Sequence, residues 1–133
     1  LTKRHRQMLD DMAETMYSAD GVGLAAPQIG KSLRMVVIDV QDEHGLLELV
    51  NPVITMREGS VVDSEGCLSV PQVYGDVERA ERVMVEYPDR RSRRRSLTAE
   101  GLLARCIQHE CDHLDGQLFI DIALSLRKEE AKE

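Results

Sequence analysis

The feature that most constrains this chain is a pair of histidines four residues apart, His109 and His113, with Glu110 directly after the first. On an α-helix, residues four apart differ in direction by only about 40°, so both imidazoles project from one face, one turn apart. Two imidazoles placed in this way can share a tetrahedral metal ion. Glu110 stays near the same face without being needed as a ligand, which suits a base that acts on a water molecule at the metal. The spacing therefore predicts a helix that carries a hydrolytic metal site.

A catalytic metal site of this kind needs a third protein ligand and one open position. Two known arrangements take the third ligand from further along the chain, either a downstream histidine or a glutamate about twenty residues on. Here Phe119 stands at the position of that histidine, and the chain nearly ends before such a glutamate could follow. A ligand from the same helix, such as Cys106, would crowd one side of the metal, and Cys111 points away from the imidazoles and is expected to be structural. The remaining possibilities lie mainly upstream. The candidates for the third ligand are Cys67, Cys106, His5, His44 and several carboxylates.

Length and charge exclude several classes of protein. A chain of 133 residues is one ordinary domain with a modest core, so residues 1–133 are expected to form a single catalytic domain. The 17 basic and 24 acidic side chains give a net charge of −7, which argues against specific DNA binding. No apolar run approaches the roughly 18–20 residues of a membrane span. Three cysteines are too few for a disulfide scaffold, which indicates a reducing compartment such as the cytoplasm.

The spacing of apolar residues predicts two helices with strands between them. We expect helices at residues 2–18 and 99–114, and strands at residues 34–40, 46–50, 52–56, 61–62, 83–87 and 96–97. One helix before and one helix after a set of strands predicts the α+β class. The expected fold is a mainly antiparallel sheet packed around the helix of His109 and His113, with an N-terminal helix.

Two segments between these elements have unusual compositions. Gly21–Gly30 reads GVGLAAPQIG and cannot be a regular helix or strand throughout. Residues 65–71 read EGCLSVP and are expected to form a non-regular turn that presents a thiolate and bare backbone N–H groups. Taken alone, the first segment is more simply explained as a tight turn, and Cys67 as a small buried residue.

Three segments together resemble the signature motifs of the peptide deformylase family. They are Gly21–Gly30 (GVGLAAPQIG), residues 65–71 (EGCLSVP) and residues 108–116 (QHECDHLDG), and they occur in the family's order and with its approximate spacing. This family removes the N-formyl group from the formyl-methionine that begins bacterial and organellar proteins. The resemblance therefore implies an amide hydrolase that acts on N-formyl-methionyl nascent peptides, in the bacterial cytoplasm or in an organelle.

The resemblance also implies the metal ligands, which are Cys67, His109 and His113. One thiolate and two imidazoles suit Fe(II), Zn(II), Ni(II) or Co(II) by their softness and geometry. The family typically works with ferrous iron, which oxidises easily and is often replaced. The resemblance thus implies Fe(II) in the cell, with Zn(II), Ni(II) or Co(II) as occupants of purified samples.

Two further roles follow from the resemblance for residues around the metal. Glu110 is implied to be the general base and acid that takes a proton from water and returns it to the departing amine. The side-chain amide of Gln28 and the backbone N–H of Leu68 are implied to donate to the oxyanion, a contribution of about 2.7–4 kcal/mol for such a donor.

The substrate-binding residues are expected on both sides of the metal. Beside Gln28, the small residues Gly21, Val22 and Gly23 favour backbone pairing with an extended peptide, because glycines let a second strand approach closely. Gly66 is expected to take part in the same way. Val22, Leu68 and Cys106 are expected to line a pocket for the methionine side chain.

Some features depart from the family or leave other functions open. The family normally carries a few dozen residues before the first helix, so an N-terminal segment is expected to be missing here. The run Arg90–Arg95 would permit a transient contact with ribosomal RNA, although a solvated loop explains it more simply. A zincin-type peptidase lacks its downstream ligand in this chain. A non-catalytic metal module would need a closed site, with Cys106 as a fourth ligand, and would have no use for Glu110 and Gln28.

Overall fold

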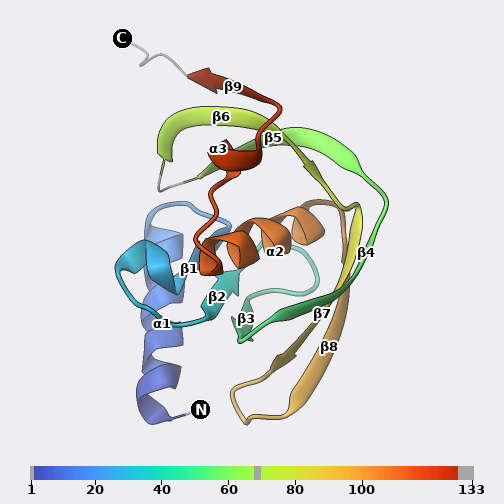
Figure 1. The fold of residues 1–133 in the computed structure, drawn as a ribbon. Helices are drawn as coiled ribbons and strands as arrows, with labels where there is room; N and C mark the ends of the chain where they lie inside the picture. Colours follow the sequence, from blue (N-terminus) through green and yellow to red (C-terminus); the bar gives the residue numbers. More distant parts are fainter. Residues whose placement is uncertain (1, 68–69, 129–133) are drawn as a thin grey trace.

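The computed structural model describes residues 2–67 and 70–128 of the chain. Within these ranges, an N-terminal helix precedes a run of short strands that a single 3-10 helix interrupts, and two further helices and a last strand follow (Figure 1). The elements are α1 (Lys3–Ser18), β1 (Gly23–Ala25), the 3-10 helix η1 (Ala26–Ile29), β2 (Met35–Ile38), β3 (Leu47–Val50), β4 (Val53–Glu58), β5 (Val61–Cys67), β6 (Val70–Arg79), β7 (Arg82–Pro88), β8 (Arg94–Glu100), α2 (Gly101–Leu114), α3 (Phe119–Ile122) and β9 (Ser125–Lys128).

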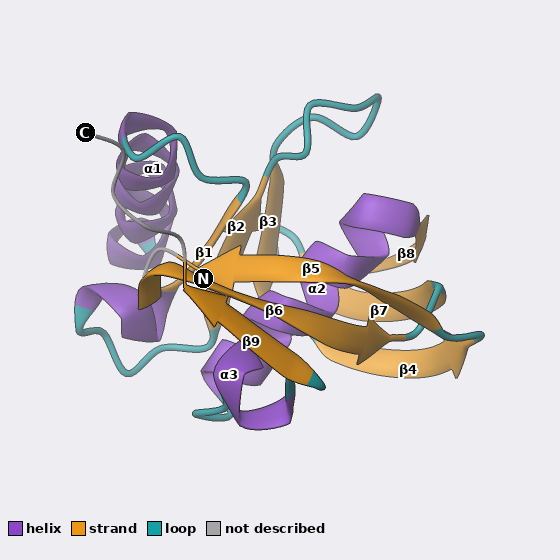
Figure 2. Cartoon of the chain, turned by 90° about the horizontal axis from the view of Figure 1, so that it is seen from above, coloured by secondary structure: helices purple, strands orange, loops and turns teal. Residues whose placement is uncertain are grey.

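The strands form three small sheets rather than one. Their orders are β1-β2-β3, β4-β7-β8 and β5-β6-β9, and each described strand pair is antiparallel. Helix α2 lies at the centre, with the sheets arranged around it (Figures 1 and 2). The predicted α+β class with antiparallel pairing is confirmed, and the division into three sheets is a refinement of it. No helix among the described residues is long and apolar enough to cross a membrane.

Strand β2 separates the two hydrophobic clusters of the molecule. Successive side chains of a strand point to opposite faces, so Val36 and Ile38 belong to the cluster around α2, whereas Met35 and Val37 belong to the cluster around α1. All four are buried, which explains why this strand is a continuous apolar run. The α1 cluster also contains Leu9, Met12 and Met16, which lie on one face of the helix predicted at residues 2–18.

Three predicted segments have different bounds in the structure. Residues 65–71 do not form one irregular turn, because Cys67 ends β5 and Val70 begins β6. The register between the two strands shifts between Gly66 and Cys67, so Pro71 lies in an irregular part of β6 where a missing N–H is tolerated. The strand predicted at 61–62 extends to Cys67, and the strand predicted at 96–97 covers Arg94–Glu100.

Strands β6 and β9 are not anticipated by the sequence pattern. Proline and glycine interrupt the alternation of β6, and β9 contains adjacent basic residues, yet the two strands pair from Val73 to Asp76. Helix α2 begins at Gly101, slightly later than predicted, because the preceding residues continue β8. These corrections matter for function, since β5 and β6 form one wall of the site.

Candidate metal centre

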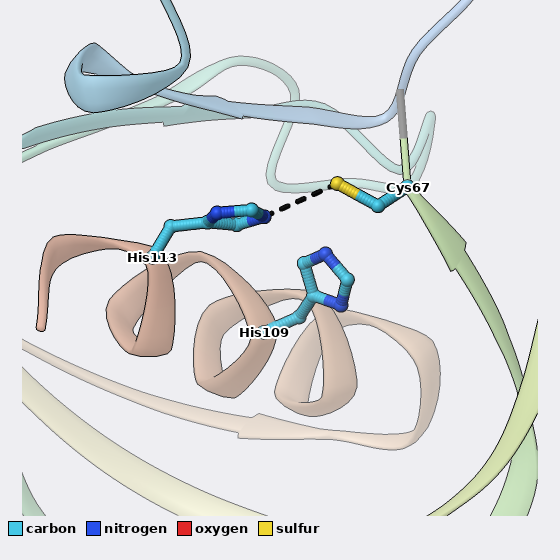
Figure 3. Close-up of side chains that lie close together, drawn as sticks. All are labelled: Cys67, His109 and His113. Carbon is cyan, nitrogen blue, oxygen red and sulfur yellow. Dashed lines mark hydrogen bonds between the residues drawn. The ribbon is translucent and has the colours of Figure 1, made fainter. Parts of the chain in front are cut away.

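Three possible metal ligands meet where α2 faces the end of β5. One ligand atom each from Cys67, His109 and His113 lies within 4.8 Å of the others. Both imidazoles project from the same side of α2 toward the sulfur, and Cys67 Sγ lies 3.2 Å from His113 Nε2 (Figure 3). The histidines are 8% and 6% exposed. The structure therefore brings together the three residues that the family resemblance implied.

The position of His109 is set by a buried carboxylate. His109 Nδ1 donates to Glu65 Oε1 over 2.8 Å, which leaves Nε2 free to face the ligand cluster. Burial alone would raise the pKa of Glu65, but hydrogen bonds with His109 and Arg79 lower it to about 2. Burial would likewise lower the pKa of His109, but hydrogen bonds to Cys67 and Glu65 raise it to about 10. A metal ion would have to displace a proton from this group, so its binding is coupled to proton release.

Sequence reasoning assigned no role to Glu65, although a local signal was available. Glu65 stands two residues before Cys67 on the same strand, so the alternation of β5 points both side chains to the same face. A buried carboxylate beside a ligand histidine is the usual outer partner in such sites. The strand predicted at residues 61–62 stops short of Glu65, so this shared face was not part of the prediction.

Glu110 lies beside the ligand cluster in a nearly dry position. It is 5% exposed, and among the described residues its Oε1 is the only buried side-chain oxygen or nitrogen without a hydrogen-bond partner. Oε1 lies 3.9 Å from His113 Nε2. Burial raises the pKa of Glu110 to about 7, although the two histidines oppose this shift. A carboxyl group with such a pKa can both accept and donate a proton near neutral pH.

Gln28, from the 3-10 helix η1, contacts the cluster at Cys67. Its Oε1 accepts a hydrogen bond from the backbone N–H of Ala25 over 2.8 Å, which fixes the orientation of the amide. Its Nε2 then points at Cys67 Sγ, at 3.5 Å. The amide is therefore positioned as a donor at the edge of the cluster. Leu68, the other expected donor, lies outside the described residues.

A cavity of about 430 Å³ opens beside these groups. It is lined by residues from the β1 region, from β5 and β6 and from α2, and His109, Glu110 and Gln28 are among them. The predicted substrate-binding residues Gly21, Val22, Gly23, Gly66 and Cys106 all line it as well. Gly23 and Gly66 make close approaches there, because a Cβ atom on either would collide with a neighbouring side chain.

The other candidates for a third ligand are used elsewhere. His5 takes part in the capping of α1, and His44 pairs with Asp42 on an exposed loop, at 3.1 Å. Cys111 packs in the core around α2, as expected. Cys106 is not part of the ligand cluster found among the described residues, and burial raises the pKa of its thiol to about 12.

The arginine run is held by carboxylates of the same chain. Arg90 makes two hydrogen bonds of 2.6 Å to Glu48 and a further one to Asp10. Arg93 and Arg95 both contact Asp89. These ion pairs tie the turn between β7 and β8 to itself and to neighbouring elements, which agrees with the simpler explanation of the run as a surface loop.

The donor set fits a divalent transition metal. One sulfur and two imidazole nitrogens are borderline-soft ligands of the kind that bind Fe(II), Ni(II), Co(II) and Zn(II). Oε1 of Glu110, which has no hydrogen-bond partner among the described residues, faces the same region. A water molecule at the metal site would supply the missing hydrogen bond. The structure thus offers three possible ligands and an adjacent buried carboxylate, an arrangement that suits a catalytic rather than a structural site.

The family model described as polypeptide deformylase matches residues 1–129. The chain belongs to the peptide deformylase family. A peptide deformylase of Pelotomaculum thermopropionicum is 57% identical over 127 residues, which cover 96% of this chain and 81% of that protein. A peptide deformylase of Caldicellulosiruptor bescii is 56% identical, with 96% of this chain and 75% of that protein covered.

Solved peptide deformylases also share the fold. The structure from Synechococcus elongatus, determined in complex with actinonin, has a TM-score of 0.88 and 52% identity, and covers 92% of this chain and 68% of that one. The structure from Thermotoga maritima has a TM-score of 0.89 and 41% identity, with coverages of 93% and 84%. Peptide deformylases are metalloenzymes, and the cluster on α2 and β5 is the corresponding possible metal site of this member.

Proposed function

We propose that this chain, acting as a single catalytic domain, hydrolyses the N-formyl group of N-terminal formyl-methionine in newly synthesised proteins and releases formate. The observation that supports this most directly is the meeting of Cys67, His109 and His113 in front of the partnerless carboxylate oxygen of Glu110. A structural metal site would have no use for a buried base held ready beside it.

Cys67, His109 and His113 would hold a divalent metal ion. Such an ion supplies a Lewis acid that polarises the formyl carbonyl group and makes a water molecule more acidic. We propose Fe(II) as the ion in the cell, with Zn(II), Ni(II) or Co(II) as substitutes, because all four suit one thiolate and two imidazoles. Glu65 keeps the proton of His109 on Nδ1, so that Nε2 is the ligand atom.

Glu110 performs the proton transfers. Its carboxylate takes a proton from the attacking water and then delivers it to the amine nitrogen as the bond to the formyl carbon breaks. The raised pKa of Glu110 suits both steps, because near pH 7 the carboxylate can accept a proton and the carboxyl group can release it again. Burial among α2 and β1 also keeps bulk water from competing for that proton.

Gln28 stabilises the negative charge that develops on the formyl oxygen. The hydrogen bond from the Ala25 backbone holds the amide in place before the reaction, so little reorganisation is needed. The backbone N–H of Leu68 is proposed as the second donor, on the strength of the family resemblance alone.

The cavity holds the methionine side chain and the first residues of the peptide. Val22 and Cys106 provide apolar lining, while Gly21, Gly23 and Gly66 allow the peptide backbone to approach closely. The formyl group is small, so most of the selectivity must come from the side chain that enters this cavity.

We further propose that the protein works in the bacterial cytoplasm, where formylated chains emerge from the ribosome. A transient ribosome contact through Arg90–Arg95 would have to use the outer faces of guanidinium groups that are mostly engaged with carboxylates. Binding of ribosomes that is unchanged when Arg91 and Arg94 are replaced by Ser would refute a contact through this run.

The deciding experiment is formate release from a formyl-Met-Ala peptide by protein loaded with Ni(II), or with Fe(II) under anaerobic conditions. Turnover is expected in the wild type, and Glu110→Ala should lower kcat by about 10²–10⁴-fold while the bound metal is retained. Loss of the metal in Glu110→Ala would mean that this residue is structural. An absence of turnover in folded, metal-loaded wild type would refute the proposed activity.

A further inference from the structure

One wall of the cavity contains a buried cation that the proposed chemistry does not use. Arg105 lines the cavity, is 8% exposed and belongs to α2. Its Nη1 donates to Glu65 Oε2 over 2.5 Å and to the carbonyl oxygen of Val77 over 3.0 Å. Its Nη2 donates to the carbonyl oxygen of Val61 over 2.8 Å. The guanidinium group therefore ties α2 to both β5 and β6.

Arg105 and His109 hold the same carboxylate from one helix face. They are four residues apart on α2, and they bind the two different oxygens of Glu65, Oε2 and Oε1. This spacing places them one turn apart on the same face. A movement of Arg105 would therefore shift the carboxylate that orients His109.

A second arginine contacts Glu65 but has a different environment. Arg79 binds both oxygens of Glu65, each over 2.9 Å, and also contacts Asp112. Arg79 is not among the described residues that line the cavity. Arg105 is thus the arginine that is shared between the cavity and the carboxylate.

We propose that Arg105 is a positioning residue that links the substrate cavity to the metal ligand His109. This inference rests on the proposed function only in taking the cavity as the substrate site. An apolar residue would be enough to line the cavity, whereas burying a guanidinium group carries a desolvation penalty. The guanidinium charge of Arg105 is explained if it holds Glu65, and through Glu65 also His109, in a fixed position relative to the part of the cavity that the substrate side chain contacts.

The proposal predicts that loss of Arg105 changes two properties at once. Without it, the side-chain partners that Glu65 keeps among the described residues are Arg79 and His109, and His109 is less firmly oriented toward the metal. The wall of the cavity also changes shape, which weakens substrate binding. Residues that serve only one of the two purposes should change only one property.

The test compares Arg105→Met with two matched variants. Arg79→Lys replaces the two-bond contact of Arg79 with Glu65 by a point donor outside the cavity. Leu102→Ala alters a cavity residue of α2 that has no hydrogen bond to Glu65 among the described residues. For each protein, Ni(II) affinity is measured by competition with a chelator, and KM is measured with formyl-Met-Ala. Folding is checked by circular dichroism.

Arg105→Met should weaken Ni(II) binding by about tenfold, the lower end of the effect of outer partners of metal ligands, and should also raise KM. Arg79→Lys should weaken Ni(II) binding alone, and Leu102→Ala should raise KM alone. Unchanged Ni(II) affinity in Arg105→Met would mean that Arg105 only lines the cavity, and unchanged KM would mean that it only holds Glu65. Either result overturns the proposed link between the cavity and His109.

Arg105→Lys provides the test if Arg105→Met does not fold. Lysine keeps the charge but is a point donor without the guanidinium fork, so both effects should persist in weaker form. Wild-type values for both properties in Arg105→Lys would overturn the proposal. An inactive wild type would refute the proposed function separately, because the Ni(II) comparison requires no turnover and still decides whether Arg105 acts on His109.

Discussion

Gly23 offers a sharp test of how Glu110 is positioned. A Cβ atom added at this residue would lie 2.4 Å from Glu110 Oε2 and 3.0 Å from Glu110 Cγ. An ordinary contact begins at 3.4 Å, so the carboxylate of Gly23→Ala would have to retreat by about 1 Å. The backbone of Gly23 has no need of a left-handed conformation, so the collision is the main consequence of the change.

The expected effect follows from the position of the base. A displacement of about 1 Å of a catalytic group costs about 10²-fold in rate. Gly23→Ala should therefore lower kcat by about 10²-fold. The three atoms nearest to the new methyl group all belong to Glu110 rather than to the proposed metal ligands, so metal content should remain that of the wild type.

The assay is formate release under saturating formyl-Met-Ala, with metal content measured on the same sample. Gly66→Ala is the matched control, because its added Cβ would meet the ring of Tyr74, at 2.8 Å, rather than Glu110. The control is expected to raise KM with a smaller effect on kcat. A wild-type kcat in Gly23→Ala, with only KM raised, would show that the strand yields and that Gly23 does not position Glu110.

Three further predictions concern the residues around the site. Cys67→Ser should lose most of its bound metal, measured by elemental analysis after dialysis, and unchanged metal content would exclude Cys67 as a ligand. The pKa of Glu65 is lowered from 4.5 to about 2 in the folded chain, so Glu65 contributes stability above about pH 4.5 that is lost as the pH falls toward 2. This contribution is about 3 kcal/mol, and urea unfolding of Glu65→Gln should show a shallower decline over that range; an unchanged slope would contradict the assignment. Arg90→Met should lower the free energy of unfolding by about 1 kcal/mol without altering Ni(II) affinity, since its ion pairs lie away from the site, and a weaker Ni(II) affinity would contradict this.

The outcome for the ligand set shows how far local patterns reach. The positions of His109, Glu110 and His113 on one helix face follow from spacing alone, because the geometry of a helix is set by its own residues. The third ligand could not be chosen in this way. Cys67 is 42 residues before His109, and only the pairing of β5 with β6 and the packing of α2 bring the two together.

The remaining errors have a common physical cause. Strands β6 and β9 lack clean alternation, so their pairing depends on partners far along the chain rather than on their own composition. The role of Glu65 depends on the same pairing, since its side chain becomes buried only when β5 lies against α2.

The sequence by itself determined that this chain has a helix with two imidazoles one turn apart on one face and a carboxylate beside them, and its three motifs pointed to a family. Those features lie within single segments of the sequence, and helical periodicity predicts the positions of the side chains on the helix directly. The tertiary structure places Cys67, which the resemblance had implied, beside the two histidines, and it alone decided which carboxylate orients His109 and which cavity adjoins it. Such relations join residues from separate elements, and they exist only after packing has buried polar groups such as Glu65 and His109 against one another.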